Sequence, residues 1–392
     1  MLGHDMHLFS RLRCISSCFT ALAFCCSTYA ADISTKAKFA YIIDKATGTV
    51  LLEKNANELM APASMAKLVT AAVVFDEIKA GRLSLDDEFI VSDEAHQKGG
   101  PASGGSTMFL RPGSRVRVED LLKGAVVQSG NDASLALAEG IAGSEAGFAR
   151  MMNKLAKNIG MVNSTFKTAT GLPHPEQKVS AKDLALIADY IISEHANFLP
   201  LYSLESFEWE GVNQSNRNPL LDEDIGADGM KTGFTEESGY GIVATANKDG
   251  LRRILVINGL ESSKERGQEA YRLLNWSYRA FEQQQILPAS HMLGRLRIYG
   301  GEKFSLEVGT RKALKTLMLK GGEFDSRYRA EVTYSAPLKA PIIAGDVVGA
   351  VKLKNLDGDI VSTADVIALE DIAKGPLHRR ALDSILSVAG LI

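Results

Sequence analysis

The sequence contains very little cysteine, and all of it lies near one end. The four cysteines among the 392 residues are Cys14, Cys18, Cys25 and Cys26. The segment that contains them has the features of a removable leader, so we expect the remaining chain to have no thiol. Disulfides, a thiolate nucleophile and a cysteine-bound metal are thereby excluded.

Neither sign of charge dominates, and histidine is scarce. The chain has 44 Lys and Arg against 47 Asp and Glu, a formal charge of −3, so the basic surface typical of nucleic-acid-binding proteins is missing. Beyond residue 30 the histidines are His96, His174, His195, His291 and His378. Their spacing is not that of metal ligands, so we expect them on the surface and expect no metal, no cofactor and no His-centred triad.

The apolar run nearest the N-terminus is too short to span a membrane. It covers residues 14–26, follows Arg11 and Arg13, and precedes small residues suited to a signal peptidase. A spanning helix needs about 20 apolar residues, and Phe24 is bulky where a lipoprotein signal requires a small residue before its cysteine. We therefore predict a signal peptide over residues 1–30 and export to the periplasm or another extracytoplasmic compartment.

The length and the 45% hydrophobic content predict two domains. Residues 39–53 have the pattern of a β-hairpin, and strand patterns return at 240–246 and 253–259. Helical periodicity is present at residues 64–79, 119–127, 132–142, 145–159, 180–193 and 264–282. Strands and helices in this order predict an α/β domain over residues 31–285.

After this domain the sequence pattern changes from long helical segments to short β-type runs. Residues 283–288, QQQILP, are expected to form a linker. Short β-type runs then occur at residues 296–299, 314–319, 330–334, 347–353 and 360–369. Residues 289–372 are therefore predicted to form a small all-β domain.

Ser64 and Lys67 form the first candidate catalytic pair. Their three-residue spacing at the start of a helical run places the hydroxyl and the ammonium on one helix face. A buried lysine near a second cation is neutral at working pH and can accept the serine proton. Alone, the pattern is weak, because Ser-x-x-Lys is also typical of a capped helix with a surface lysine.

Two further motifs strengthen this interpretation. Ser129-Gly130-Asn131 lies in a break between two helical runs, where both polar side chains can face a cleft or where Asn131 can simply cap a helix. Lys231-Thr232-Gly233 precedes a strand pattern, and it predicts either a strand edge that a substrate backbone can approach or an exposed turn.

In this order the three motifs resemble those of penicillin-recognising acyl-serine transferases. More specifically, the chain resembles the low-molecular-mass penicillin-binding proteins that are D-alanyl-D-alanine carboxypeptidases. Further segments that carry the likeness are PASMAK at 62–67, MFLRPG at 108–113, QSGNDA at 128–133, TGL at 170–172, DGMKTG at 228–233 and LLNW at 273–276. The resemblance implies a β-lactamase/transpeptidase-like catalytic domain, with helices on both faces of an antiparallel sheet and a helical subdomain, followed by the all-β domain.

The resemblance also implies catalytic roles. Ser64 is the acylated nucleophile and Lys67 its base, while Ser129 and Lys231 relay or stabilise the proton on the leaving group. Asn131 holds the substrate amide. The implied substrate is the peptidoglycan stem pentapeptide, whose terminal D-alanine is removed, and β-lactam antibiotics are the implied covalent inhibitors.

The remaining implied residues bind the substrate. Thr232 and Arg266 bind its terminal carboxylate, Gly233 lets its backbone approach, and the N–H groups of Ser64 and Phe234 form the oxyanion hole. Phe234 stands where several relatives have a histidine, so the substrate preference is open.

Three other functions remain possible at this point. A class A β-lactamase shares the motifs, but no Glu-x-x-Leu-Asn occurs between Ser129 and Lys231. A DD-endopeptidase acting on crosslinked stem peptides uses the same catalytic groups. A non-catalytic wall-binding module would retain the motifs only as relics.

The last 17 residues, 376–392, have apolar residues at helical spacing: Leu382, Ile385, Leu386, Ala389 and Ile392. Lys374, Arg379 and Arg380 lie at the start of this stretch. We predict an amphipathic helix that lies on the anionic inner-membrane surface, as the resemblance implies. The alternative is a terminal helix packed against its own β-domain.

Overall fold

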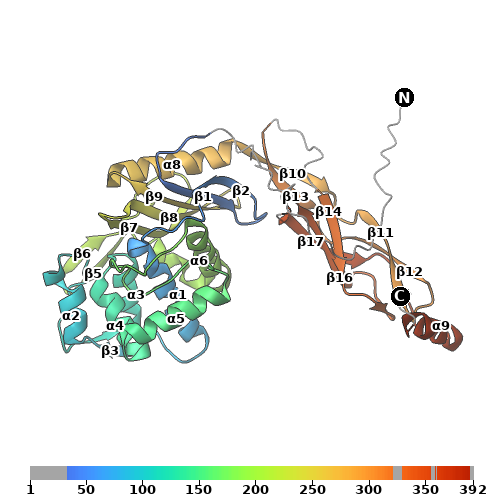
Figure 1. The fold of residues 1–392 in the computed structure, drawn as a ribbon, viewed down its shortest axis with the longest axis horizontal. Coiled ribbons are helices and arrows are strands. Elements are labelled where there is room, and N and C mark those ends of the chain that lie inside the picture. Colours follow the sequence, from blue (N-terminus) through green and yellow to red (C-terminus); the bar gives the residue numbers. More distant parts are fainter. Residues whose placement is uncertain (1–32, 321–328, 355–357, 359, 389–392) are drawn as a thin grey trace.

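A computed structural model of the chain describes residues 33–320, 329–354, 358 and 360–388. The predicted signal peptide lies outside these residues. Figure 1 shows two bodies that meet at β10 (Phe281–Leu287), with the last helix at the far end of the second body. We call the first body the α/β domain and the second the β-domain.

A five-stranded antiparallel sheet forms the centre of the α/β domain. Its strand order is β2 (Val50–Lys54), β1 (Phe39–Asp44), β9 (Leu251–Leu260), β8 (Gly239–Lys248) and β7 (Ala227–Thr235). The predicted hairpin and the two later strands are confirmed. Because β7 is the outermost strand, one edge of its backbone has no neighbouring strand in this sheet and can pair with an extended ligand.

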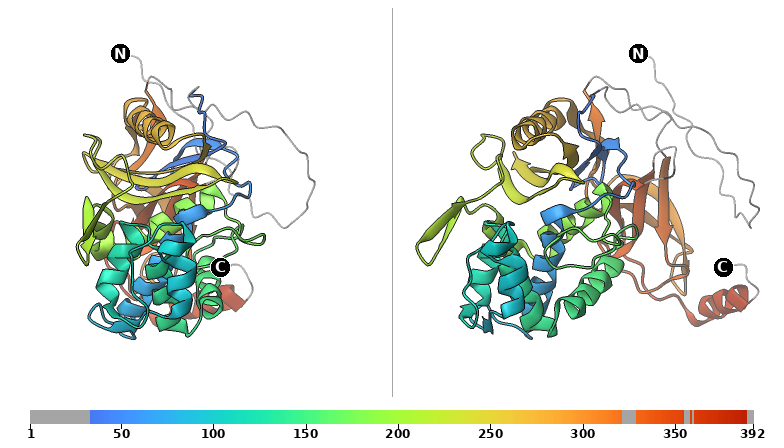
Figure 2. Two further views of the ribbon diagram at one scale, coloured as in Figure 1. Left: turned by 90° about the vertical axis from the view of Figure 1, so that its left-hand side faces the viewer. Right: turned by 60° about the vertical axis from the view of Figure 1, so that its left-hand side comes forward.

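Helices cover both faces of this sheet. On one face lies α8 (Ser263–Arg279), as Figure 2 shows. The opposite side carries the helical part of the domain, whose long helices are α1 (Lys67–Lys79), α3 (Val118–Val126), α4 (Asn131–Ala142), α5 (Glu145–Asn158) and α6 (Ala181–Glu194). All were predicted within a few residues, and the antiparallel sheet with helices on both faces is confirmed.

Shorter elements complete the domain. They are η1 (Ala63–Ala66), β3 (Glu88–Ile90), α2 (Asp93–Gly99), η2 (Pro101–Ser103), β4 (Arg115–Arg117), η3 (Ala196–Phe198), α7 (Leu199–Tyr202), β5 (Ser206–Trp209) and β6 (Val212–Ser215). The β5–β6 hairpin extends away from the sheet (Figure 2). Most of these pieces are too short for their periodicity to be read from the sequence.

Two apolar cores hold the layers together. In α1 every residue from Lys67 to Phe75 is buried, so this helix has no polar face along that stretch and runs through the centre of the larger core. The smaller core joins Leu273 and Leu274 of α8 to Ile42 and Leu255 of the sheet. Each such side chain contributes about 1.5–3 kcal/mol on burial, which fixes α1 and α8 relative to the strands between them.

The β-domain contains a six-stranded sheet and a two-stranded one. The larger has the order β14 (Arg329–Tyr334), β16 (Val347–Lys354), β17 (Ile360–Ala368), β12 (Ser305–Thr310), β11 (Met292–Tyr299) and β15 (Leu338–Lys339). The smaller pairs β10 with β13 (Leu314–Leu319). The all-β character predicted for this region is confirmed.

Two expectations are wrong. Residues 283–288 were expected to be a linker, but residues 281–287 form β10, because its backbone pairs with the later strand β13. His195 was expected on the surface, yet it is 1% exposed and its Nε2 lies 2.9 Å from Asp76 Oδ1. A buried imidazole needs such a polar partner, and α1 supplies it.

The last helix, α9 (Leu377–Val388), contacts the β-domain through polar groups. Asp383 is 1% exposed and accepts a 2.7 Å hydrogen bond from the N–H of Gly300. Leu377 and Ile385 are 80% and 66% exposed. In the described part of the chain, no helix is both long enough and apolar enough to cross a bilayer. The predicted apolar residues Ala389 and Ile392, and the side chains of Leu382 and Leu386, lie outside what the structure describes.

Candidate active site

Ser64 and Lys67 lie together where the chain enters the central helix. Ser64 is in η1, and α1 begins at Lys67. The Nζ atom of Lys67 is 3.1 Å from Ser64 Oγ. Ser64 is half-buried and Lys67 is 1% exposed. The prediction that this spacing places both groups on one face is confirmed.

Lys67 is held by two more acceptors. Its Nζ atom lies 2.8 Å from Asn131 Oδ1 and 2.6 Å from the carbonyl oxygen of Thr170. Burial, and then repulsion from Arg217, lowers the pKa of Lys67 to about 7, against an opposing attraction to Asp132. A substantial share of this lysine is therefore uncharged at neutral pH and able to accept a proton.

The Ser129-Gly130-Asn131 motif forms a strained turn between α3 and α4. Ser129 has a φ of 61°, which is unusual for a residue other than glycine. Its Oγ atom is buried and makes no hydrogen bond within the described chain. Asn131 begins α4 and is 3% exposed. The turn thus holds a buried, unpaired hydroxyl two residues before Asn131, which contacts Lys67.

Asp132 ties this turn to the segment that passes over it. Its carboxylate accepts hydrogen bonds from Thr107 Oγ1 at 2.6 Å and from the N–H groups of Met108 and Leu110 at 2.8 and 3.0 Å. Asp132 is fully buried, and a buried carboxylate with several donors is strongly held. This network fixes Asn131 next to Lys67.

Lys231 and Gly233 come from the edge strand β7. The alternative that residues 228–234 form an exposed turn is wrong, because they lie in β7 and residues 229–234 pair with β8. Burial, followed by repulsion from Lys67 and two arginines, lowers the pKa of Lys231. A methyl group on Gly233 would lie 3.0 Å from Ala63 Cβ, so this glycine also allows η1 to pack against β7.

Arg217, which follows the β5–β6 hairpin, was missed in the sequence because no motif surrounds it. Its guanidinium donates to Ser106 Oγ, and its carbonyl oxygen accepts a 3.3 Å hydrogen bond from Arg266. It is also the cation that depresses the pKa of Lys67. Only the tertiary structure shows that the predicted second cation near Lys67 is this residue.

Arg266, on α8, lies next to the β7–β8 end of the sheet. It is 6% exposed, and burial is the main cause that lowers its pKa to about 10. Its Nη2 atom donates to Ser263 Oγ at 3.0 Å, while its Nε atom is buried without a hydrogen bond inside the described chain. The guanidinium carbon is 5.9 Å from the centre of the Tyr240 ring.

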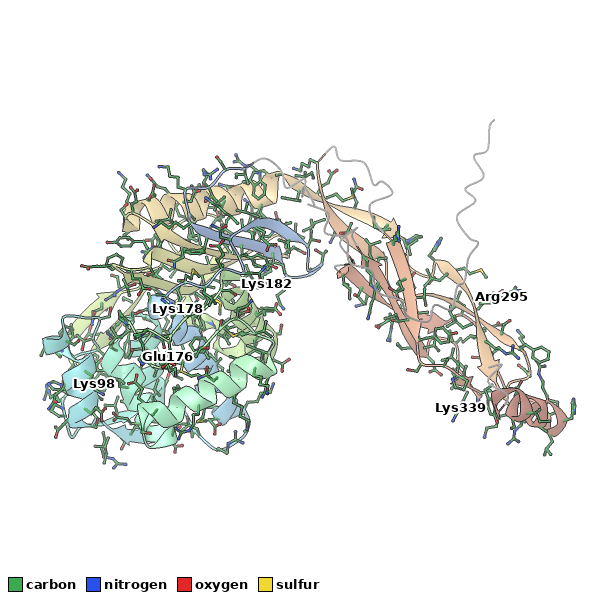
Figure 3. All side chains as sticks on the ribbon, viewed as in Figure 1. Lys98, Glu176, Lys178, Lys182, Arg295 and Lys339 are labelled. Atoms are coloured by element: carbon green, nitrogen blue, oxygen red, sulfur yellow. The ribbon has the colours of Figure 1, made fainter. Side chains whose placement is uncertain are left out.

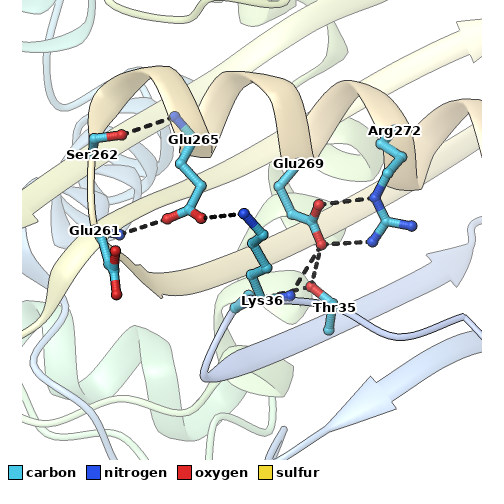
Figure 4. Close-up of polar contacts among 8 residues, drawn as sticks. Thr35, Lys36, Glu261, Ser262, Glu265, Glu269 and Arg272 are labelled. Carbon is cyan, nitrogen blue, oxygen red and sulfur yellow. Dashed lines mark hydrogen bonds and ion pairs between the residues drawn. The ribbon is translucent and has the colours of Figure 1, made fainter.

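The N-terminal turn of α8 is anchored to the start of the described chain (Figure 4). Thr35 donates a 2.6 Å hydrogen bond to Glu269, and Lys36 forms a 3.1 Å ion pair with Glu265. Ser262 caps the helix by accepting from the N–H of Glu265. These contacts hold the turn of α8 that carries Arg266.

Thr232 and Phe234 complete the set of predicted residues. Thr232 is 5% exposed, whereas Phe234 is 49% exposed and stacks on Tyr240 with ring centres 4.2 Å apart. The structure therefore brings the predicted residues together from η1, α1, the turn before α4, strand β7 and helix α8. The described residues contain no group of three His, Cys, Asp or Glu side chains suited to a metal.

Family profiles match both parts of the chain. The profile of D-alanyl-D-alanine carboxypeptidase (peptidase S11) matches residues 26–262, and that of the C-terminal domain of penicillin-binding protein 5 matches residues 281–374. The chain belongs to the D-alanyl-D-alanine carboxypeptidase family. This confirms the resemblance inferred from the motifs and the class of enzyme, a serine hydrolase.

Two of the similar proteins match most of the chain, and a third matches a shorter part of it. D-alanyl-D-alanine carboxypeptidase DacC of Escherichia coli (strain K12) is 34% identical over 94% of this chain and 92% of its own. The crystal structure of penicillin binding protein 5 from Haemophilus influenzae has a TM-score of 0.74 and 33% identity, covering 88% of this chain and 99% of that one. Penicillin-binding protein D2 from Listeria monocytogenes, solved in an ampicillin-bound form, has a TM-score of 0.54 and 29% identity over 63% of this chain and 99% of its own.

Proposed function

We propose that this enzyme removes the terminal D-alanine from peptidoglycan stem pentapeptides through an acyl-enzyme on Ser64. The observation that carries the proposal is the Ser64–Lys67 contact of 3.1 Å, together with the Lys67 pKa of about 7. A lysine base must be uncharged when it takes the serine proton, and burial supplies that condition here.

Acylation begins when uncharged Lys67 takes the proton of Ser64 and the serine oxygen attacks the carbonyl carbon of the penultimate D-alanine. The developing oxyanion is stabilised by the backbone N–H groups of Ser64 and Phe234. Close packing of Gly233 on Ala63 supports this, since the two N–H groups belong to the residues that follow this contact.

Collapse of the tetrahedral intermediate breaks the peptide bond and releases D-alanine. Its amine must gain a proton, and we assign the route from the protonated Lys67 through Ser129 Oγ to that amine, with Lys231 stabilising this relay. The unpaired Ser129 hydroxyl supports this assignment. Lys67, uncharged again, then takes a proton from the water that attacks the ester, and it returns this proton to Ser64 Oγ as the shortened peptide leaves.

Substrate binding is assigned to the open edge of β7 and to Arg266. The stem peptide pairs as an extended strand with β7, and Asn131 holds its amide. Its terminal carboxylate binds Thr232 and the Arg266 guanidinium, which offers a planar fork of donors. Penicillins occupy the same place and acylate Ser64.

Two measurements test this function. Ser64→Ala should abolish covalent penicillin attachment and lower kcat by roughly a millionfold, as removal of a nucleophile from a catalytic unit can do. The matched control is Ser203→Ala, an exposed serine. A penicillin adduct on another residue, or a labelled Ser64→Ala protein, would refute the mechanism, and a wild-type protein without turnover would indicate a wall-binding module.

Product analysis separates the remaining activities. Release of D-alanine from a pentapeptide identifies a carboxypeptidase, whereas separated stem peptides from a crosslinked dimer identify an endopeptidase. Rapid turnover of penicillin instead of a stable adduct would identify a β-lactamase.

We also infer that the chain is exported by residues 1–30 and attached to the inner-membrane surface by α9. Residues two apart on a helix differ by about 200° around its axis, so Ile385 lies opposite Asp383, which is bound to the β-domain. Lys339 lies on the half of the β-domain nearer to α9 (Figure 3), and the side chains of Lys374 and Arg380 are exposed. An exposed apolar side with cations nearby suits an anionic membrane surface.

A further inference from the structure

We propose that Phe234 and Tyr240 form an aromatic wall beside the terminal-carboxylate subsite, and that this wall selects stem peptides whose last residue is small. The inference rests on the proposed function. The wall is formed by the rings of Phe234 and Tyr240, whereas the oxyanion hole uses only the backbone N–H group of Phe234.

Strand geometry places the Phe234 ring next to the carboxylate ligands. Gly233 faces η1, with Met65 Cγ 3.2 Å from the position of a Cβ on this glycine. Its neighbours in the strand, Thr232 and Phe234, must then face the opposite side, where α8 carries Arg266. The Thr232 hydroxyl, the Phe234 ring and the Arg266 guanidinium therefore share one side of the sheet edge.

Tyr240 fixes this ring in place. It is the cross-strand partner of Phe234 in the β7–β8 ladder, and the two rings stack 4.2 Å apart at 28°. Tyr240 is half-buried and packs against the core beneath α8. Aromatic pairs of this kind add roughly 0.5–1.5 kcal/mol beyond burial, so Phe234 is held although it is 49% exposed.

The same stack borders an arginine that still has an unused donor. The Arg266 guanidinium lies 5.9 Å from the Tyr240 ring centre, and its Nε atom is buried without a hydrogen-bond partner in the described chain. A buried donor without a partner is costly, and the carboxylate of a bound substrate removes that cost. The wall therefore stands where the last residue of the substrate lies.

The consequence is a limit on the size of that residue. D-alanine carries only a methyl group on the α-carbon that joins its carboxylate to the scissile amide, whereas a branched side chain there would collide with the fixed ring. One added or missing methylene in such a site changes kcat/KM by roughly 10–200-fold.

The test compares stem pentapeptides ending in D-Ala-D-Ala and D-Ala-D-Leu. Phe234→Ala should raise the ratio of kcat/KM for D-leucine release over D-alanine release by roughly tenfold or more. Tyr240→Phe keeps the ring and should leave the ratio unchanged, while Tyr240→Ala should raise it. Phe304→Ala, a 55% exposed phenylalanine of the β-domain, is the matched control and should change nothing.

The outcomes separate this inference from the proposed function. An unchanged ratio in Phe234→Ala, in a protein that still releases D-alanine and is labelled by penicillin, overturns the wall but not the function. A wild-type protein that releases no D-alanine overturns the function itself. If Phe234→Ala folds poorly, Tyr240→Ala provides the second comparison, and an unchanged ratio in that variant also overturns the wall.

Discussion

At the residue scale the proposed mechanism depends on the charge of Lys67. Its Nζ atom is enclosed by Ser64, Asn131 and Thr170, and its pKa of about 7 makes the uncharged form available at neutral pH. The largest cause of the lowered Lys67 pKa is burial, and a substitution at another residue leaves Lys67 buried. The second cause is repulsion from Arg217, which can be removed alone.

Arg217→Gln should therefore move acylation to higher pH. Removing a nearby cation raises the pKa of Lys67, so less of this lysine is uncharged below the new pKa. The rate of penicillin acylation, measured from about pH 5.5 to 9.5, should rise through a midpoint near 7 in wild type and through a higher midpoint in the variant. The two rates should converge at the alkaline end.

Arg295→Gln is the matched control for this pH profile. Its side chain is 65% exposed on the β-domain, and the profile should be that of wild type. A uniform loss in Arg217→Gln at every pH would contradict the electrostatic account and indicate a contact with the ligand instead.

At the element scale the site depends on close contacts between loops and η1. Gly171 has a φ of 80°, and a methyl group there would lie 1.9 Å from the carbonyl oxygen of Ala63. Gly171 follows Thr170, whose carbonyl oxygen accepts from Lys67. The packing of this loop against η1 thus positions the carbonyl oxygen that accepts a hydrogen bond from Lys67.

Gly171→Ala should slow penicillin acylation and lower the free energy of unfolding. Gly160→Ala separates backbone strain from collision, because Gly160 has a φ of 87° but no atom lies within 4 Å of the place that a methyl group would take. Strain alone costs roughly 1–2 kcal/mol, so this control should lose stability in urea unfolding but keep its acylation rate. Equal acylation in both variants would show that the Ala63 contact is unimportant.

At the scale of the whole molecule, the two bodies separate the site from α9. The candidate site belongs to the α/β domain, and α9 lies at the far end of the β-domain (Figure 1). This arrangement would hold the catalytic groups away from a membrane to which α9 is attached. Attachment and catalysis should therefore be separable.

Deleting residues 376–392 should abolish binding to anionic vesicles at low salt and leave penicillin labelling of Ser64 unchanged. Co-sedimentation with vesicles measures the first, and mass spectrometry the second. Ile385→Ser, which changes only an exposed apolar side chain, should weaken binding without removing the helix. If the truncated protein unfolds, or if the chain without residues 1–30 does not bind vesicles, α9 is a structural helix of the β-domain.

The sequence by itself determined the family, the order of the long elements and most of the candidate site. Motifs such as Ser64-x-x-Lys67 could be read because their residues are close in the chain, and long helices have enough turns to show periodicity. Short pieces such as β5 and β6 gave no such signal. The prediction of a linker at residues 283–288 was wrong. It rested on the polar composition and the proline at the end of this segment, but the backbone there pairs with β13.

Only the tertiary structure decided the surroundings of these motifs. The charge of Arg217 lowers the pKa of Lys67, although the two residues are far apart in the sequence. The loop that contains Gly171 packs closely against Ala63. His195 can be buried because its Nε2 atom contacts the carboxylate of Asp76 in α1. At α9 the sequence predicted an apolar side but could not say which side contacts the β-domain. The hydrogen bond from Gly300 to Asp383 decided that, because a carboxylate buried in this way must face its donor.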